Sequence, residues 1–310
     1  MLSLNLKRLI LVCTLCTSFV CVSQQSADTT MVPKLERPYY KINEGPTVHI
    51  DEMHNNFHTK NGRFKPFSDL LKRDGYQVKA LINYDDLKTQ DILVISNAIE
   101  PRNIGNWQQP IYDAFKTKEI EQIKQWVSNG GRLLLIADHM PFSGASNTLA
   151  NAFGFDFCDG FARLSKPRNQ PDVFSKNNQR LIASKLTDGT YGKSLDSITT
   201  FTGSSFQIPS KAIGILKFKK GDTCLQPEIA WQFNDDTKTK DLEDNYQGAI
   251  MDFGKGKLAV FGEAAQFTAQ TITNASGTFK VGFNSKNAPN NIDFIRNLML
   301  WLGSNNTIKQ

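Results

Sequence analysis

The chain has 310 residues, of which 40% are hydrophobic and 21% are charged, and it carries a formal net charge of +6. This length and apolar content are sufficient for one large globular domain with a substantial core, and they exclude a disordered or membrane-embedded chain as a whole. The basic excess is small, and the basic residues form no long stripe, so we expect no nucleic-acid partner.

Residues 1–23 have the layout of a cleavable secretory signal. Lys7 and Arg8 precede an apolar stretch, and Cys21 and Ser23 supply small residues near its end. The apolar stretch is shorter than the roughly 20 residues that span a membrane, so we expect no transmembrane segment in the mature chain. The sequence therefore predicts an exported protein, periplasmic or secreted, with cleavage near Ser23.

Removing this leader takes away two basic residues and no acidic ones, which lowers the formal net charge from +6 to +4. Lipidation at Cys21 is an alternative, but Val20 before it fits that processing poorly. Of the five cysteines, the mature chain would keep only Cys158 and Cys224. These two either form one disulfide or remain as buried free thiols, and their spacing does not decide between the two.

We expect a polar tether over residues 24–44, one domain over residues 45–303 and a flexible tail over residues 304–310. The first half of the domain alternates apolar runs with amphipathic segments, as a parallel sheet does. Strands are predicted over residues 47–53, 76–83, 91–98 and 131–138. Helices are predicted over residues 64–75 and within residues 117–131, the latter capped by Thr117 and ending at the paired glycines Gly130 and Gly131. A short helix is predicted over residues 146–154, and a long surface loop over residues 165–180.

The second half carries antiparallel signals. Short strands are predicted over residues 198–209, 212–223 and 228–233, and a hairpin over residues 247–264 turns through Gly254, Lys255 and Gly256. An amphipathic helix over residues 290–303 closes the domain. The fold class predicted is α/β: a doubly wound, mostly parallel sheet with an antiparallel hairpin extension in the C-terminal half.

All four histidines lie in two short polar stretches that follow predicted strands: His49, His54 and His58 in one, and His139 in the other. Parallel strands end at the same edge of a sheet, and open α/β folds build their sites there. Asn97 and Glu263 also follow predicted strands. We therefore expect these side chains to converge on one cleft.

His54 and His58 are four residues apart, which on a helical turn places both rings on one face. With Asp51 and His139 they would supply donors for one divalent metal ion of the zinc, manganese or iron type. Asp138, His139 and Glu263 are the candidate catalytic residues, with Glu263 as general base. A structural interpretation stands beside each role: His49 is expected to be a satisfied strand residue, and Glu263 is equally suited to cap the helical segment that follows it.

Asn55, Arg63 and Asn97 are the candidate substrate-binding residues, since each lies at or near the expected cleft. Arg63 could instead form a surface ion pair. Trp107, Phe142 and Trp231 could stack on sugar rings, although large aromatic side chains more often pack in a core. No phosphate-binding glycine loop follows the first strand, so we expect no nucleotide cofactor.

Several segments together resemble an exported branch of the class I glutamine amidotransferase-like superfamily. They are residues 49–76, 91–99, 130–145, 152–157, 200–203 and 262–270. The resemblance implies a flavodoxin-like, doubly wound sheet. The glutaminases of that superfamily carry a cysteine at a strand-to-helix elbow and a later histidine. Here the comparable strand leads into His139 and Met140, and no histidine follows residue 139, so the resemblance does not imply glutamine hydrolysis.

Two hypotheses of function remain. The first is an exported hydrolase, with or without a metal ion, that acts on a small polar or carbohydrate-like substrate at the carboxyl edge of the sheet. The second is a non-catalytic binding module of the cell envelope, which recognises a glycan, a peptide or a protein. The sequence leaves the oligomeric state open.

Overall fold

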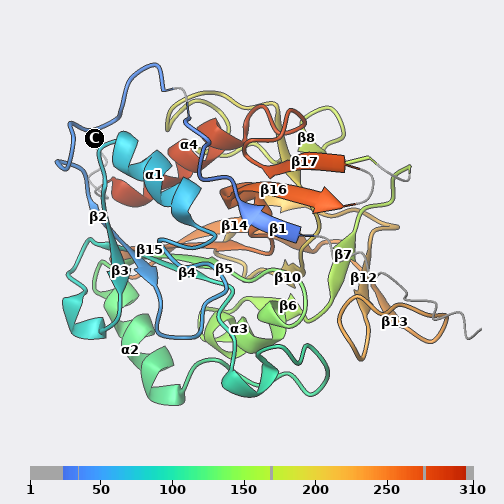
Figure 1. Ribbon diagram of the computed structural model, residues 1–310. Helices are drawn as coiled ribbons and strands as arrows, with labels where there is room; N and C mark the ends of the chain where they lie inside the picture. The colour runs from blue at the N-terminus through green and yellow to red at the C-terminus, as the bar shows by residue number, and fades with distance from the viewer. Residues whose placement is uncertain (1–23, 34, 168–169, 275–276, 305–310) are drawn as a thin grey trace, which may run out of the picture.

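The computed structural model describes residues 24–33, 35–167, 170–274 and 277–304. Its centre is a nine-stranded sheet in the order β3-β2-β4-β5-β15-β14-β10-β6, with β11 also paired to β14 (Figure 1). Five neighbouring strands are parallel: β3 (Gln77–Leu81), β2 (Thr47–Asp51), β4 (Ile92–Ser96), β5 (Arg132–Ile136) and β15 (Gly256–Phe261). The four strands predicted in the first half are thereby confirmed. Because these strands run in the same direction, their carboxyl ends lie along one edge.

The remaining strands of this sheet are antiparallel. They are β14 (Tyr246–Phe253), β10 (Ser205–Gln207), β6 (Asp156–Cys158) and β11 (Ile213–Lys217). β14 and β15 form the predicted hairpin, which turns at Gly254 with a positive φ of 59°. A Cβ at Gly254 would lie 2.5 Å from the carbonyl oxygen of Ser128, so only glycine fits this turn.

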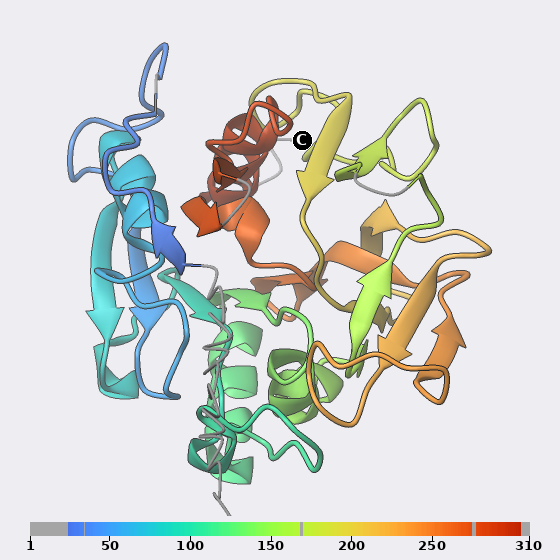
Figure 2. The same cartoon turned by 45° about the vertical axis from the view of Figure 1, so that its right-hand side comes forward.

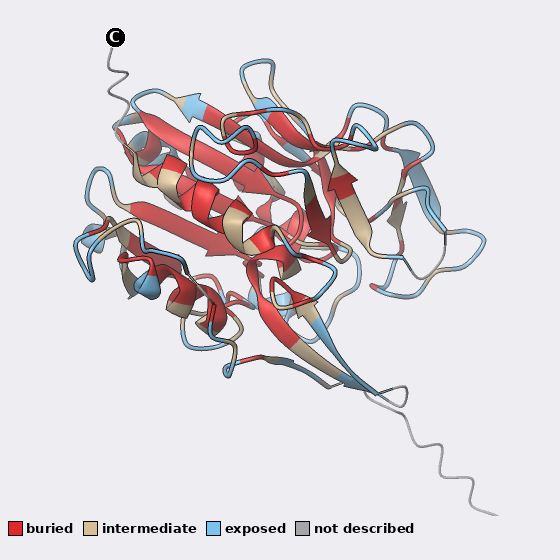
Figure 3. Cartoon of the chain, turned by 90° about the horizontal axis from the view of Figure 1, so that it is seen from above, coloured by how far each residue is buried: buried red, intermediate tan, exposed pale blue. Residues whose placement is uncertain are grey.

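Helices cover both faces of the sheet (Figure 1). α1 (Lys65–Arg73) and α4 (Asn291–Gly303) lie on one face, and α2 (Thr117–Ser128) and α3 (Phe142–Asn151) lie on the other. Alternate side chains of β4 and β5 enter the two cores, and every residue of these two strands is buried (Figure 3). Burial on both faces explains why their sequences are continuous apolar runs.

Several helix boundaries differ from the prediction. α2 begins at Thr117 itself, and its N-cap is Lys116, whose backbone N–H donates to the Glu119 carboxylate at 2.7 Å. The Glu119 side chain therefore caps the helix, a role that was expected of the Thr117 hydroxyl. α3 starts at Phe142, four residues earlier than predicted.

Two smaller sheets lie beside the C-terminal half of the main sheet. One has the order β13 (Lys238–Asp241), β12 (Thr223–Gln226), β7 (Phe161–Arg163), and the other pairs β8 (Asp172–Ser175) with β9 (Ser197–Thr200) (Figure 2). β8 interrupts the loop predicted over residues 165–180. Residues 228–233, predicted as a strand, contribute only a bridge between Ile229 and Gln108. A disulfide between Cys158 and Cys224 joins the main sheet to β12, which settles the question that the cysteine spacing left open.

The segment predicted as a tether belongs to the fold. β1 (Gln24–Ala27) pairs with β16 (Ala269–Asn274), which pairs with β17 (Gly277–Gly282). Met31, Leu35 and Tyr40 pack against the core, so residues 24–44 are held by backbone hydrogen bonds and by apolar contacts. The predicted signal lies outside the described residues. Within the described part, no helix combines the length and hydropathy of a membrane span.

In the described part of the chain, three 3-10 helices complete the elements: η1 (Tyr84–Asp86), η2 (Pro101–Asn103) and η3 (Ala265–Phe267). η1 and η3 follow strands of the main sheet at the carboxyl edge, where the histidine-bearing segments also lie. This edge is the region where the site was predicted.

Candidate functional site

Asn97 joins the two histidine-bearing segments at the carboxyl edge of the sheet. Its carbonyl oxygen accepts the backbone N–H of Phe57 at 3.0 Å, and its side-chain oxygen accepts that of Asp138 at 3.0 Å. Its own N–H donates to Ile136, the last residue of β5, at 2.9 Å. Residues 54–58 and 138–139 therefore meet at one edge, as predicted. Asn97 is buried and adopts a positive φ of 50°, so its amide oxygen holds backbone and is not directed at a ligand.

His54 belongs to a buried hydrogen-bonded group with Asp51 and Tyr84. Its Nδ1 donates to Asp51 Oδ2 at 2.7 Å, its Nε2 lies 3.4 Å from the Tyr84 hydroxyl, and its ring lies 4.3 Å from that of Phe115 between centroids. Burial, followed by the charge of Asp51, raises the pKa of Tyr84. His54 and Asp51 are 5% and 1% exposed, so both ring nitrogens of His54 have partners inside the protein.

His58 is buried in an apolar environment. Its ring lies 4.7 Å from that of Phe64, and its Nδ1 has no hydrogen-bond partner among the described residues. Burial, assisted by the nearby positive charge of Arg63, lowers the pKa of His58 to about 3. The Arg63 guanidinium lies 4.2 Å from the centre of the Phe57 ring. His58 is therefore a neutral packing residue at neutral pH.

His139 lies within a cluster of aromatic rings. Phe161 stacks on it at 4.6 Å with an interplanar angle of 13°, and Trp231 meets it edge-on at 4.7 Å. Trp107 and Phe142 lie farther away, at 6.1 Å each. The Nδ1 of His139 lies 2.7 Å from the carbonyl oxygen of Met140, so Nδ1 carries the proton and donates. Within the described chain, no residue pairs with Nε2, which in neutral imidazole is left with its lone pair.

Three carboxylates lie close to His139 or follow the neighbouring strand. Asp138 Oδ1 accepts the N–H of His139 at 2.8 Å. Both oxygens of Glu263 accept backbone N–H groups, from Ala265 at 2.8 Å and Gln266 at 2.7 Å. Burial, followed by the charge of Asp138, raises the pKa of Glu263 well above its usual value. Glu263 is 1% exposed, and this geometry favours the capping role over that of a general base.

The third carboxylate near His139 is that of Asp159, which was not predicted from the sequence. It accepts hydrogen bonds from Gln109, Ser143 and the Gly144 N–H, each at 3.0 Å. Burial raises the pKa of its carboxyl, and these three hydrogen bonds oppose that shift. The turn between two short strands that carries Asp159 has no recognisable motif, so only the three-dimensional structure identifies this residue.

The four predicted metal ligands do not form one set. Within the described residues, no group of three or more His, Cys, Asp or Glu side chains is placed to hold a metal ion. The reason is packing: Asp51 and His54 use their polar atoms on each other, His58 lies against Phe64, and His139 lies among aromatic rings. The residues present therefore do not fit the expected divalent ion.

The remaining predicted residues have local roles. His49 is a buried strand residue, as expected; its Nε2 lies 3.0 Å from Asp91 Oδ2, whereas its Nδ1 has no hydrogen-bond partner among the described residues. Asn55 is exposed, and its side chain donates to the carbonyl of Ile99 at 3.2 Å. Arg63 forms no surface ion pair with Asp69, which instead pairs with Lys65 and Lys72.

A pocket of about 320 Å³ opens next to the His139 cluster. Phe161 and Trp231, the two rings closest to His139, form one wall, and Thr202, Arg163 and Asp172 also line it. Trp231 is 53% exposed and has a positive φ of 69°, an uncommon backbone conformation for a bulky residue. Residues held in such uncommon backbone conformations cluster at active sites and ligand-binding sites.

The chain matches no known protein family and no curated protein sequence. Among solved structures it is similar to the N-terminal domain of mmIFT52, with a TM-score of 0.55 and 13% identity, covering 84% of this chain and 98% of that one. It is also similar to the cytoplasmic protein STM1381 from Salmonella typhimurium LT2 (TM-score 0.44, 14% identity, 83% and 97% covered) and to a ThuA-like protein from Bacteroides uniformis ATCC 8492 (0.42, 10%, 89% and 96%). Likeness at these identities concerns the fold alone.

Proposed function

We propose that this chain is an exported binding protein that holds a carbohydrate-like ligand against Trp231 and Phe161, at the carboxyl edge of the sheet. The observation that carries the proposal is the solvent-facing indole of Trp231, held by a strained backbone over a pocket large enough for a sugar ring. Flat apolar ring faces with polar groups around them are the surfaces on which sugars stack. Arg163, Asp172 and Thr202 supply such polar groups here.

Binding fits the geometry better than catalysis does, because the predicted general base and two of the predicted metal ligands make their contacts inside the protein. The Glu263 carboxylate caps η3, His54 is sealed between Asp51 and Phe115, and His58 is buried. These groups stabilise the fold and do not reach the pocket.

The direct test measures the binding of soluble polysaccharides by affinity electrophoresis and by tryptophan fluorescence. Trp231→Ala should abolish binding, because the stacking face is removed. Phe279→Ala is the matched control, since Phe279 is also an exposed aromatic residue (42%) but lies on β17. Equal binding by the wild type and Trp231→Ala would exclude the proposed surface.

A second candidate, a hydrolase, is favoured by one observation: His139 presents an Nε2 without a protein partner within the described residues, beside Asp138. A neutral imidazole in that state can take a proton from an attacking water molecule. Release of reducing ends from a polysaccharide, lost in His139→Gln, would support it. A metal-assisted version requires zinc, manganese or iron in the purified protein, which elemental analysis measures directly.

We also propose that the fold is doubly wound and flavodoxin-like and that the chain is related to the class I glutamine amidotransferase-like superfamily. The strand order β3-β2-β4-β5-β15 supports the first proposal, because the chain adds strands on one side of β2 and then on the other. Export is supported by the Cys158–Cys224 disulfide, since such bonds persist in oxidising compartments. Fractionation of cells that express the whole chain tests export.

A further inference from the structure

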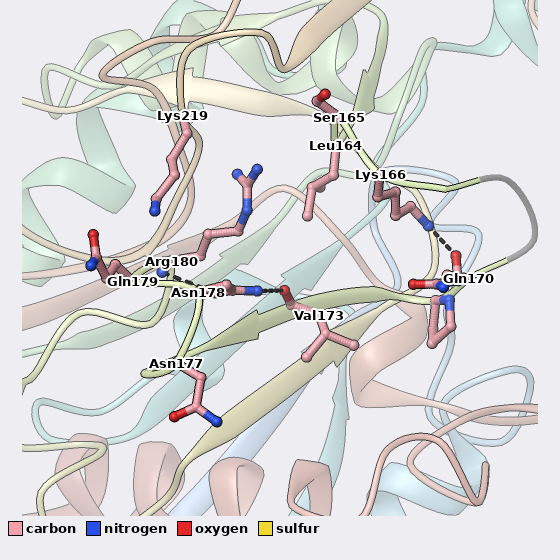
Figure 4. Close-up of a pocket in the computed structure, with 11 residues that line it drawn as sticks. Leu164, Ser165, Lys166, Gln170, Val173, Asn177, Asn178, Gln179, Arg180 and Lys219 are labelled. Carbon is pink, nitrogen blue, oxygen red and sulfur yellow. Dashed lines mark hydrogen bonds between the residues drawn. The ribbon is translucent and has the colours of Figure 1, made fainter.

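A second pocket, of about 490 Å³, lies next to the one described above. It is enclosed by residues 164–166 after β7, by β8 and the turn that follows it, and by Lys219 after β11 (Figure 4). In that view Lys219 and Arg180 stand on one side and Lys166 on the other. Three of its lining residues are cationic, and none is acidic.

A buried carboxylate fixes the walls of this pocket. Asp222, which is fully buried, forms a bidentate ion pair with the Arg180 guanidinium. The same carboxylate accepts the backbone N–H of Ser165 at 2.7 Å and that of Lys219 at 2.7 Å. Three lining segments far apart in sequence are therefore tied to a single side chain, which makes the pocket preorganised for a ligand.

The charges of the pocket leave a positive excess. Arg180 is balanced by Asp222, and Lys166 by Asp172, whose Oδ1 lies 2.6 Å from the Lys166 ammonium. Lys219 has no ion-pair partner among the described residues. The bidentate pair uses two of the five N–H donors of Arg180, so the guanidinium retains donors for a further acceptor.

The two pockets share Leu164 and Lys166, so they form neighbouring subsites on one surface. A sugar stacked on Trp231 would thus have its neighbouring unit near Lys219 and Arg180. A lone ammonium beside a partly used guanidinium is suited to a single anionic group with several acceptor oxygens.

We infer that the Lys219–Arg180 pocket binds an anionic substituent, a carboxylate or a sulfate ester, of an acidic polysaccharide. This inference rests on the proposed carbohydrate binding for the identity of the chain that carries the anion. The anion subsite itself rests only on the charges and on the Asp222 anchor.

The test uses the purified protein and matched polymer pairs: polygalacturonate with its methyl ester, and dextran sulfate with dextran. Binding to at least one acidic polymer should exceed binding to its neutral partner, and the preferred pair identifies carboxylate or sulfate as the group. Lys219→Gln should lower affinity for that acidic polymer about ten-fold and leave affinity for the neutral one unchanged. Lys220→Gln is the control, because Lys220 is an exposed neighbour that does not line the pocket.

The outcomes separate the two proposals. Equal losses in Lys219→Gln and Lys220→Gln, or no preference for either acidic polymer, would overturn the anion subsite. If Trp231→Ala keeps full binding while Lys219→Gln loses it, the anion subsite stands and the aromatic platform fails. Binding of neutral polymers that depends on Trp231, with no effect of Lys219→Gln on any polymer, supports the platform alone.

Discussion

The disulfide between Cys158 and Cys224 should account for a large part of the stability of this protein. It closes a loop between residues 66 positions apart and joins β6, at the edge of the main sheet, to β12 of the smaller sheet. In the chain-entropy account, closing a loop of this length restricts the unfolded chain by about 4 kcal/mol at 25 °C. Both cysteines are buried, at 4% and 0% exposure, so reduction also leaves two thiols in the core.

The measurement is equilibrium unfolding in urea of the oxidised protein and of the protein reduced in dithiothreitol. We expect a loss of about 4 kcal/mol in the free energy of unfolding on reduction. The control is the double variant Cys158→Ala, Cys224→Ala, which should match the reduced protein and should not respond to dithiothreitol. A reduced protein within about 1 kcal/mol of the oxidised one would refute the entropy argument for this loop.

Three further predictions follow from buried and exposed groups. Burial lowers the pKa of His58 to about 3 from an ordinary value of 6.5, so the stability that its neutral form gives above pH 6.5 is lost as the pH falls toward 3. Between pH 7 and 4.5, urea unfolding should show a loss of about 2.5 kcal/mol in the wild type that His58→Phe lacks. Asp222→Asn should destabilise the protein by about 3–5 kcal/mol, because the Arg180 cation stays buried and loses its counter-charge. A variant as stable as the wild type would mean that Arg180 reaches solvent. Trp231→Ala should lower the free energy of unfolding by only about 1–2 kcal/mol, since half of the side chain is exposed and the other half contacts His139 and Phe161. A loss above about 3 kcal/mol would show that Trp231 is a packing residue.

The central strands could be predicted because their sequences report their environment directly. Every residue of β4 and β5 is buried, and a continuous apolar run is what burial on both faces of a sheet requires. The order of strands along the chain then predicted that Asn97, Asp138 and the histidine-bearing segments lie at the same edge. The hydrogen bonds of Asn97 confirm this prediction.

The surroundings of His54 and His139 could not be predicted, because they depend on residues far away in the sequence. Phe115 covers His54 from a segment some sixty positions later, and Trp231 reaches His139 from more than ninety positions later. Neither contact leaves a periodic signal. The four-residue spacing of His54 and His58 suggested one helical face, but no helix forms there, and the two rings pack in different surroundings.

Hydrogen-bonding capacity separates the structural polar groups from those available to a ligand. Asp222, Glu263 and the Asp51–His54 pair have their capacity used by neighbours inside the protein, so changing them should act on stability first. His139 Nε2 and the Lys219 ammonium have no such partners within the described residues, and each lies in or beside a pocket. A buried group without a partner costs free energy, whereas one at a pocket wall is solvated until a ligand replaces the water. The ligand is therefore expected to contact the second group of residues, and the first group holds them in place.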